Sequence, residues 1–359
     1  MSLQTRPAEQ GFARNRWYVA AFSHEVGREF LARTYLDIPV VLFRTENGDA
    51  VALLDRCPHR NLPLSMGRLV GNVVRCGYHG IEFNTDGTCA GIPQQTLVPP
   101  RMCVRAFPVV EKWQWLWIWM GDEVADPALI PDHSELGLQR KGFTAVPFFM
   151  MEFAANYQYL FDNLLDSTHV SYIHEGLLDS GEVASSVYSV RHSGNTVIMD
   201  RKNINVCFDA GVAKFFHVRP NYLYDRELNQ EARLPNIVTG KNIITDPKNP
   251  GQSFEFYGSQ GLTPSTARST YFFNVAGTSY EHDWTPQEIH HIWNVVHQDK
   301  VALDAIQARH DQFGPDYLEC SIKSDHAGME ARRILTDMVA ADVASARAAK
   351  PQHARPVSN

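Results

Sequence analysis

The sequence predicts an α+β protein in two parts, an all-β region followed by a mixed region. Between Trp17 and Gly121, short runs of β-forming residues alternate with turn signals, and helical periodicity is scarce. The rest of the chain runs in the order helix, strands, helix, which is typical of an antiparallel sheet that packs against helices. A chain of 359 residues is long enough for two such domains. We therefore expect domains at residues 1–121 and 122–349, and a flexible tail at 350–359.

The all-β region contains two hairpin signals and one strand rich in tryptophan. Asn47-Gly48 and Asp86-Gly87 are residue pairs typical of tight turns between antiparallel strands. In the stretch WQWLWIWMG, tryptophan recurs at every second position, which places these side chains on one face of a strand. We expect them to be packing residues: Trp113, Trp115, Trp117 and Trp119.

The mixed region begins after a proline-containing connection, DEVADPALIPD. Helical periodicity predicts a helix from about residue 151 to 174, and the stretch from about 187 to 276 is rich in β-formers. A second helix is expected over 285–312 and a last one over 328–349. The start of the second helix has a capping hydroxyl at Thr285, a proline in the first turn and an acid three residues on.

Composition limits the classes of partner. The formal net charge is −7 and no run of lysine and arginine stands out, which argues against nucleic acid and against an anionic membrane surface. The first residues lack the apolar stretch of a signal peptide, and no segment is apolar enough to span a membrane, so a cytoplasmic protein is expected. Six cysteines are too few for a disulfide scaffold in a chain of this size.

Two of the cysteines have a histidine close by in each of two loops. RCPHRNLPLS contains Cys57 and His59, and RCGYHGIEF contains Cys76 and His79. Two thiolates and two imidazoles can hold zinc, or a [2Fe-2S] cluster in which histidine binds one of the irons. The spacing favours the cluster, because each loop supplies one ligand of each kind instead of the paired cysteines of a zinc finger. The other four cysteines have no histidine at ligand spacing, and we expect them to be small buried residues.

The motifs CPHR and CGYHG resemble the Rieske motif, in the form found in Rieske oxygenases. Respiratory Rieske proteins carry an extra cysteine in each loop, where this chain has Leu62 and Tyr78. The resemblance implies that residues 1–121 form a Rieske [2Fe-2S] domain. It also implies that the second domain is a helix-grip catalytic domain.

A second group of residues lies in NLLDSTHVSYIHEG. His169 and His174 are five positions apart, so one regular helix face cannot hold both, and taken alone they are two unrelated helix histidines. The stretch nevertheless resembles the N-x-x-D-x-x-H-x(4)-H motif of Rieske oxygenases, which implies that both histidines bind a mononuclear iron and that the helix is irregular between them. The third ligand implied is Asp299, with Asp304 as the alternative on the same expected helix. The residue before Asp299 is Gln298, where an acid is usual.

Two more residues of the motif are implied to be catalytic. The resemblance gives Asp166 a hydrogen bond to His169 and another to His79 of a neighbouring subunit, so that it links the two metals. Asn163 is expected near the iron. The alternatives are a surface aspartate and a plain polar helix residue.

The resemblance to the vanillate and dicamba O-demethylase type runs over nearly the whole chain and implies a terminal oxygenase. Such an enzyme uses O2, and electrons from a separate flavin and ferredoxin-type reductase or a ferredoxin, in a homotrimer with electron transfer between subunits. The expected reaction is monooxygenation of a small aromatic compound, by O-demethylation or hydroxylation. Ring dioxygenation, desulfonation and N-demethylation are alternatives, and a Rieske electron-transfer protein is the non-enzyme alternative.

The substrate is not readable from the sequence. By position, Gln260 and His290 match substrate contacts of dicamba O-demethylase, although that enzyme has other residue types there. Four phenylalanines would suit a flat aromatic substrate and would equally suit a core: Phe215, Phe216, Phe272 and Phe273.

Overall fold

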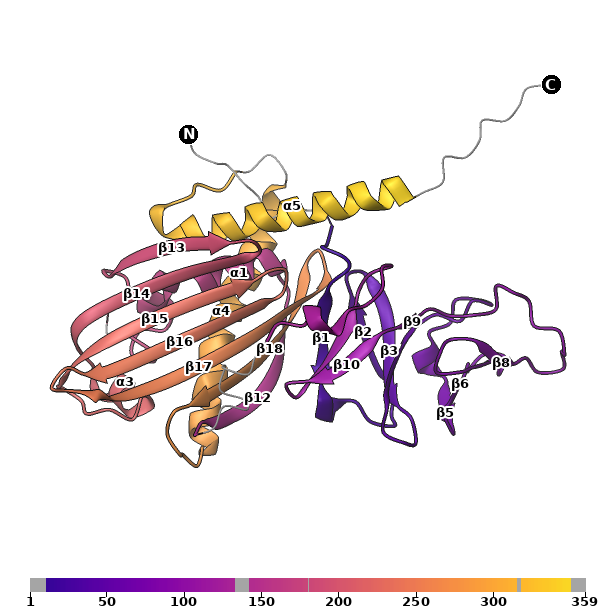
Figure 1. The fold of residues 1–359 in the computed structure, drawn as a ribbon, viewed down its shortest axis with the longest axis horizontal. Helices are drawn as coiled ribbons and strands as arrows, with labels where there is room; N and C mark the ends of the chain where they lie inside the picture. The colour runs from indigo at the N-terminus through magenta and orange to yellow at the C-terminus, as the bar shows by residue number, and fades with distance from the viewer. Residues whose placement is uncertain (1–10, 133–141, 180, 315–317, 350–359) are drawn as a thin grey trace, which may run out of the picture.

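The computed structural model describes residues 11–132, 142–179, 181–314 and 318–349, so the expected tail at 350–359 lies outside the described residues. None of the described helices is long and apolar enough to cross a membrane. Figure 1 shows a β-rich N-terminal part at one end of the long axis and one large sheet with its helices at the other.

The N-terminal part is built of three small antiparallel sheets. Their strand orders are β1-β11-β10, β2-β3-β4-β9 and β5-β6-β7-β8. The strands are β1 (Trp17–Phe22), β2 (Leu31–Tyr35), β3 (Ile38–Arg44), β4 (Ala50–Leu54), β5 (Arg68–Val70), β6 (Val73–Arg75), β7 (Glu82–Phe83), β8 (Cys89–Gly91), β9 (Ala106–Phe107), β10 (Val109–Lys112) and β11 (Trp115–Trp119). Both expected turns are confirmed, because Asn47-Gly48 joins β3 to β4 and Asp86-Gly87 joins β7 to β8.

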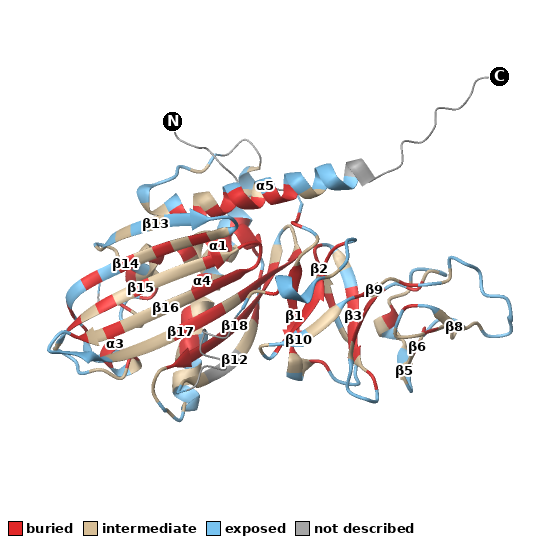
Figure 2. Ribbon diagram, in the orientation of Figure 1, coloured by how far each residue is buried: buried red, intermediate tan, exposed pale blue. Residues whose placement is uncertain are grey.

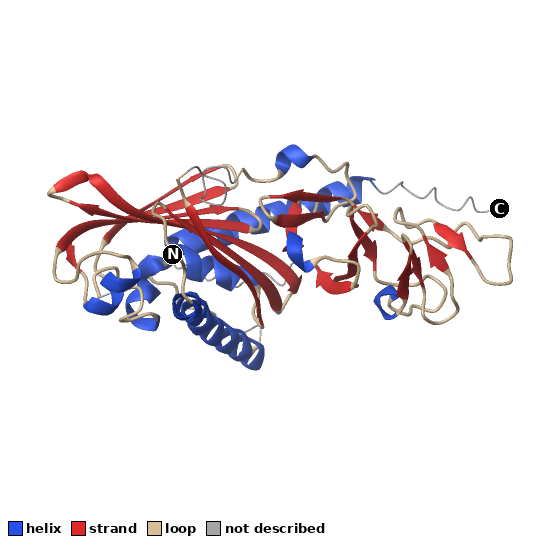
Figure 3. Ribbon diagram, turned by 90° about the horizontal axis from the view of Figure 1, so that it is seen from below, coloured by secondary structure: helices blue, strands red, loops and turns tan. Residues whose placement is uncertain are grey.

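The C-terminal part contains a seven-stranded antiparallel sheet of order β12-β18-β17-β16-β15-β14-β13. Its strands are β12 (Thr144–Phe153), β13 (Val187–Ser193), β14 (Thr196–Cys207), β15 (Leu223–Arg233), β16 (Ile237–Asp246), β17 (Asn249–Thr266) and β18 (Ser269–Thr278). The α-helices are α1 (Tyr157–Leu165), α2 (Val170–Ile173), α3 (Ala210–Phe215), α4 (Pro286–Phe313) and α5 (His326–Ala349). Short 3-10 helices are η1 (Ser23–Glu25), η2 (Leu64–Met66), η3 (Pro127–Leu129), η4 (Ser167–His169) and η5 (Lys323–Asp325). Seen from below, the helices gather on one side of the sheet, as the predicted α+β class requires (Figure 3).

The prediction of a helix over residues 151–174 is wrong at its start. Residues up to Phe153 belong to β12, which pairs with β18, and α1 begins only at Tyr157. Asn156 caps this helix, since its side-chain oxygen accepts from the amide of Gln158. Pairing with β18 therefore outweighs the helical periodicity of Met151 and its neighbours.

Helix α4 begins as predicted. Thr285 and Glu288 form a reciprocal capping box, and proline occupies the first turn. Helix α5 runs along β13 and β14 and contacts α1 (Figure 1). It is tied to α1 by Arg332, whose guanidinium reaches Asp162 and also lies 2.7 Å from an oxygen of Glu319.

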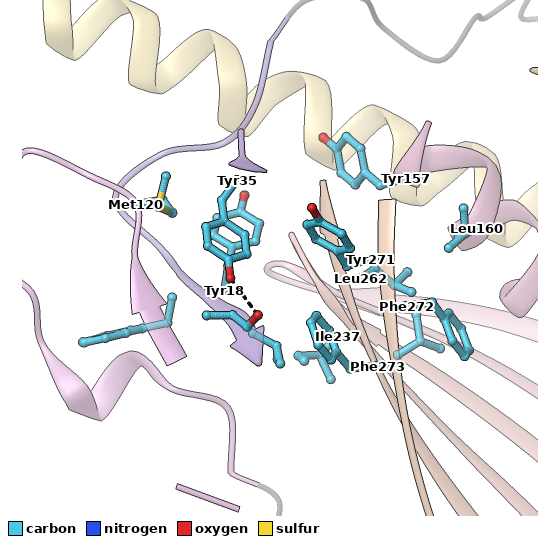
Figure 4. Packing of buried hydrophobic residues seen from close by; sticks show 14 of the residues in the cluster. Tyr18, Tyr35, Met120, Tyr157, Leu160, Ile237, Leu262, Tyr271, Phe272 and Phe273 are labelled. Carbon is cyan, nitrogen blue, oxygen red and sulfur yellow. Dashed lines mark hydrogen bonds between the residues drawn. The ribbon is translucent and has the colours of Figure 1, made fainter. Parts of the chain in front are cut away.

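One hydrophobic core joins the two parts of the molecule. Its residues come from β1 and β11 on one side and from the large sheet on the other (Figure 4). Asn236 donates to the carbonyl of Trp17 at 2.8 Å, and Thr263 donates to the carbonyl of Val19 at 2.7 Å. A Cβ on Gly261 would lie 2.8 Å from a methyl of Val19, so glycine is needed for this close approach. The buried stripes in Figure 2 run through this junction, whereas the far end of the N-terminal part is mostly exposed.

Two details depart from expectation. Trp113 lies in the turn before β11 with a φ of +62°, so of the four tryptophans at alternate positions only Trp115, Trp117 and Trp119 are buried strand residues.

The expectation of burial for the remaining cysteines is wrong. Cys89 is half-buried, and three others are exposed: Cys103, Cys207 and Cys320. A thiol is small enough to be tolerated at a strand end or in a loop.

Candidate metal centres and substrate cavity

The two Cys/His loops meet at the exposed end of the N-terminal part. Cys57 and Cys76 are buried, whereas His59 and His79 are exposed, and the two Nδ1 atoms lie 3.1 Å apart. Burial raises the pKa of the Cys57 thiol, whose side chain also contacts Cys76. Paired soft sulfurs on the inside and paired imidazole nitrogens facing solvent fit a [2Fe-2S] cluster with histidine on the outer iron.

Glycines let these two loops pack directly against each other. A Cβ on Gly67 would lie 2.2 Å from the carbonyl oxygen of Arg75, and one on Gly77 would lie 2.7 Å from that of Met66. Any side chain at either position would push the loops apart. The loops therefore hold their four candidate ligands close only because both glycines are present.

The histidines of the second group lie where the helix is broken. Asp166 ends α1 with extended backbone angles and caps η4, which contains His169. The short α2 follows and ends before His174, whose φ and ψ of −110° and 25° are not helical. The predicted irregularity between the histidines is confirmed. It turns the two rings toward each other, with centroids 5.3 Å apart.

The structure brings both histidines to Asp299 on α4. The Nε2 atoms of His169 and His174 lie 3.6 and 3.2 Å from Oδ1 of Asp299. The alternative, Asp304, does not join them, because it accepts from the amide of Ala154 and pairs with Lys300. Two imidazoles and one carboxylate on a common side form the donor set that suits a non-heme iron with open positions.

Each candidate ligand is held from behind by another group. Nδ1 of His169 lies 2.5 Å from the main-chain oxygen of Asp166, and Nδ1 of His174 lies 2.9 Å from Oε1 of Gln298. Both acceptors fix the ring proton on Nδ1 and leave Nε2 free to bind a metal. Asn163 donates to Oδ1 of Asp299 at 3.0 Å.

The electrostatics of His169, His174 and Asp299, together called the trio, suit the binding of a cation. Burial lowers the pKa of His169. Burial acts in the same direction on His174, but the hydrogen bond and the charge of Asp299 outweigh it and raise the pKa of this ring. The carboxylate thus stabilises positive charge between the two imidazoles.

Asp166 contacts His169 in a way that the motif did not indicate. Its main-chain oxygen faces the ring, while its carboxylate accepts from the amide of Thr168 and lies 3.4 Å from the guanidinium of Arg201. Arg201 is buried and also donates to the hydroxyl of Thr168 at 2.7 Å. Arg201 has no recognisable spacing in the sequence, since it comes from β14.

A cavity of about 190 Å³ lies between the large sheet and helices α1 and α4, and the trio forms part of its wall. Residues on the sheet alternate between its two faces, so every second position faces the cavity. The floor combines aromatic, small and carboxamide side chains: Phe256, Phe272, Gly240, Gly258, Ala276, Gln230, Asn242, Gln260 and Asn274. Apolar residues of α4 close the opposite side: Ile292, Val295 and Val296.

Of the two expected substrate contacts, Gln260 and His290, one lies in the wall of the cavity and the other does not. Gln260 lines the cavity and donates to Asn274 at 3.3 Å. His290 is outside the lining, exposed on α4 and stacked on Trp293. The helix turns the next residue, His291, inward against Phe215. Of the four phenylalanines, only Phe273 is not in the lining, and it packs in the core between the two parts.

Both basic side chains of the cavity lining, Arg226 and Lys241, interact with other groups of the protein. Arg226 is buried, with Asp179 at 3.3 Å and Glu182 at 2.6 Å. Lys241 pairs with Tyr257 across the strands, and its ammonium lies over that ring on the sheet face opposite the floor. The polar groups left to contact a ligand from the floor are therefore mainly carboxamides.

Comparisons with known proteins agree with this geometry. Residues 16–108 match the Rieske [2Fe-2S] domain, and residues 153–341 match the vanillate O-demethylase oxygenase C-terminal domain. The chain therefore belongs to the Rieske non-heme iron oxygenases, as an oxygenase component. Within them it is of the vanillate and dicamba O-demethylase type, and it has the cofactors of that family, a Rieske [2Fe-2S] cluster and a mononuclear iron.

Several relatives are similar over different lengths. The oxygenase component of dicamba O-demethylase from Stenotrophomonas maltophilia is 30% identical over 83% of this chain and 89% of its own. The putative toluene-4-sulfonate monooxygenase system iron-sulfur subunit of Comamonas testosteroni is 46% identical, over 48% of this chain and 49% of its own, so this match spans about half the relative's length. The structure of dicamba monooxygenase bound to 3,6-dichlorosalicylic acid superposes with a TM-score of 0.84, at 29% identity, over 95% of this chain and all of the other.

Proposed function

We propose that this protein is the oxygenase component of an O2-dependent monooxygenase that hydroxylates a methyl or methoxy carbon on a small aromatic compound. One observation carries the proposal. The trio of His169, His174 and Asp299 faces a cavity whose other walls are aromatic, aliphatic, small and carboxamide side chains. Hydroxylation of a methoxy carbon gives a hemiacetal that collapses to a phenol and formaldehyde.

The metal ligands follow from the two donor sets. Cys57, His59, Cys76 and His79 hold the cluster, and the trio holds the iron. When bound, the cluster would supply electrons one at a time, and the iron would supply open positions for O2. The acceptors behind the two rings keep both Nδ1 protons in place throughout.

The cavity size selects the class of substrate. An apolar cavity of about 150 Å³ binds benzene, so about 190 Å³ suits one ring with small substituents. Phe215, Phe216 and Phe256 supply aromatic rings against which a substrate ring can pack, and the carboxamides of Gln230 and Gln260 offer hydrogen bonds to a polar substituent. We assign Gln260 to substrate binding and leave His290 out.

The position of the two metal sites supports electron transfer between subunits of the proposed homotrimer. In one chain the strands β5 to β8, whose loops carry the Cys/His pairs, lie at one end of the long axis, whereas α1 and α4 lie beside the large sheet in the other part (Figure 1). Electron tunnelling falls steeply with distance, so an electron from the cluster should enter the iron site of a neighbouring subunit. We assign Asp166 to that junction, between His169 of its own chain and His79 of the next, with Asn163 as an orienting group for Asp299.

The remaining assignments concern partners and organisation. We propose that a separate flavin and ferredoxin-type reductase, or a ferredoxin, supplies the electrons in the cytoplasm. We also propose that the chain divides after residue 121 into a Rieske domain and a catalytic domain that ends at 349. The shared core means that the two domains are not independent folding units.

A substrate panel tests the function. Iron-loaded protein with a surrogate reductase is incubated with methoxy and methyl arenes that carry a carboxylate, a sulfonate or only a hydroxyl. Formaldehyde or a hydroxymethyl product, formed with O2 uptake and lost in Asp299→Ala, is expected. A cis-diol or a released sulfite would replace the proposed reaction by one of its alternatives. An intact cluster with no iron at the trio would instead indicate an electron-transfer protein.

A further inference from the structure

A second group of two histidines and one carboxylate lies apart from the trio. His217 lies two residues after the end of α3, His282 lies between β18 and α4, and Glu288 is in the first turn of α4. One candidate ligand atom from each lies within 4.8 Å of the others. Glu288 and Asp299 are eleven positions apart on the same helix, which at 1.5 Å per residue separates the two groups by about 16 Å along its axis.

The geometry of this group is close to that of a metal site. The rings of His217 and His282 have centroids 4.2 Å apart, and Nε2 of His282 lies 3.1 Å from Oε2 of Glu288. Ligands about 2.0–2.1 Å from a tetrahedral zinc lie about 3.3 Å from one another. The three side chains therefore need only a small adjustment to share one ion.

The protonation states also suit a metal. Burial and the neighbouring His282 lower the pKa of His217, which favours the neutral ring that a metal binds. Burial would raise the pKa of Glu288, but hydrogen bonds from the amide and hydroxyl of Thr285 and from His282 lower it to about 2. The carboxylate is therefore anionic, and these hydrogen bonds all use Oε2. Among the described residues, no hydrogen bond engages Oε1 of Glu288 or a ring nitrogen of His217.

The group joins two walls of the substrate cavity. Phe215 and Phe216, immediately before His217, line the cavity from one side, and Ile292, one turn beyond Glu288, lines it from α4. We propose that His217, His282 and Glu288 bind a divalent transition-metal ion, with zinc as the natural probe, and that the ion clamps the end of α3 to the start of α4. This site is separate from the iron site and does not depend on the proposed reaction.

Zinc titration of the iron-loaded protein tests the site. Calorimetry should detect one zinc per chain that Glu288→Gln weakens at least tenfold, as should His217→Asn. The glutamine keeps the capping box, so Glu288→Gln separates loss of a ligand from loss of the helix start. The matched control is His192→Asn, which removes an exposed histidine that pairs with a single carboxylate, Glu330, and should leave zinc affinity unchanged.

Two further measurements locate the ion. Crystals soaked in zinc should give an anomalous peak at the zinc edge between the three side chains, and zinc should slow hydrogen exchange over residues 210–217 and 281–292. Equal zinc affinity in the wild type and Glu288→Gln, or an anomalous peak only elsewhere, would overturn the proposal. If His217→Asn does not fold, Glu288→Gln and the crystal decide alone.

Discussion

Two groups of two histidines and one carboxylate lie on or beside the same helix, and they differ in how they are supported. His169 and His174 each have Nδ1 fixed by an oxygen, and Asp299 is fixed by Asn163. In the second group, Glu288 is fixed by its helix cap, while the side chain of His217 has ring contacts and no hydrogen bond among the described residues. Orientation of each ligand from behind sharpens metal affinity and geometry. The first group is therefore arranged to bind one ion tightly and in a fixed geometry, whereas the second group would bind an ion that exchanges more easily.

The groups also differ in what they face. The trio opens onto a cavity with aromatic and carboxamide walls, whereas His217 and His282 are packed among Tyr280 and Trp284. A metal at the trio would face the cavity, whereas a metal at the second group would lie among side chains outside its lining. The same donor set can thus serve chemistry in one place and fold in the other.

Replacing the carboxylate of the first group should have the largest effect. Asp299→Ala should lower iron from about three to about two atoms per chain and abolish turnover, while the cluster spectrum remains, because the cluster alone accounts for two. Iron and sulfide analysis measures this. Glu288→Gln serves as the comparison and should retain all of its iron. Full iron in Asp299→Ala would transfer the ligand role to Asp304.

Replacing Asp166, at the proposed junction between the cluster and the iron, should have the next largest effect on turnover. Asp166→Asn keeps the main-chain oxygen that faces His169, and so should keep both metals, but it removes the charge beside Arg201. Turnover should fall by about 100-fold, the upper range for groups behind metal ligands. Stopped-flow oxidation of the reduced cluster in the presence of O2 and substrate follows the step directly. Unchanged turnover would exclude the bridging role of Asp166.

These contacts show which part of the site was readable from the sequence. The six candidate histidine and cysteine ligands and Asp299 lie in motifs, so the resemblance points to all of them. The contact between Asp166 and His169 is present as predicted, but the atom that makes it could not be predicted, because a motif does not say whether a main-chain or a side-chain oxygen faces a ring. Gln298 was noted only as a departure, yet it is the residue that orients His174.

The fold was predictable where local signals agreed with pairing. The Thr285 cap and the Asn47-Gly48 turn were read correctly, because capping and turn geometry depend on a few neighbouring residues. The start of α1 was not, since Met151 pairs with Phe272 more than a hundred residues away. His217 and His282 were also missed, because three ligands from three elements leave no spacing to recognise.

Gln298 gives a smaller test of the support behind the first group. Gln298→Leu removes the acceptor of the His174 Nδ1 proton, and Gln298→Glu replaces it with a charged one. We expect Gln298→Leu to lose iron about 30-fold faster, within the range for such groups, and Gln298→Glu to hold iron at least as tightly as the wild type. The release of iron to a chelator measures both. Equal release from all three proteins would mean that Gln298 does not position the ring.

A substitution in the sheet that forms the floor of the cavity should have the smallest effect on activity. Gly258 lies opposite Gly240 and beside Gln260, and a Cβ at Gly258 would lie 2.7 Å from Nε2 of Gln260. Gly258→Ala should therefore displace that carboxamide and change kcat/KM by about tenfold, as for one methylene in a pocket. The control is Gly251→Ala, where the nearest atom is 3.9 Å away. Iron content should stay constant in both, and an unchanged kcat/KM in Gly258→Ala would place the substrate away from Gln260.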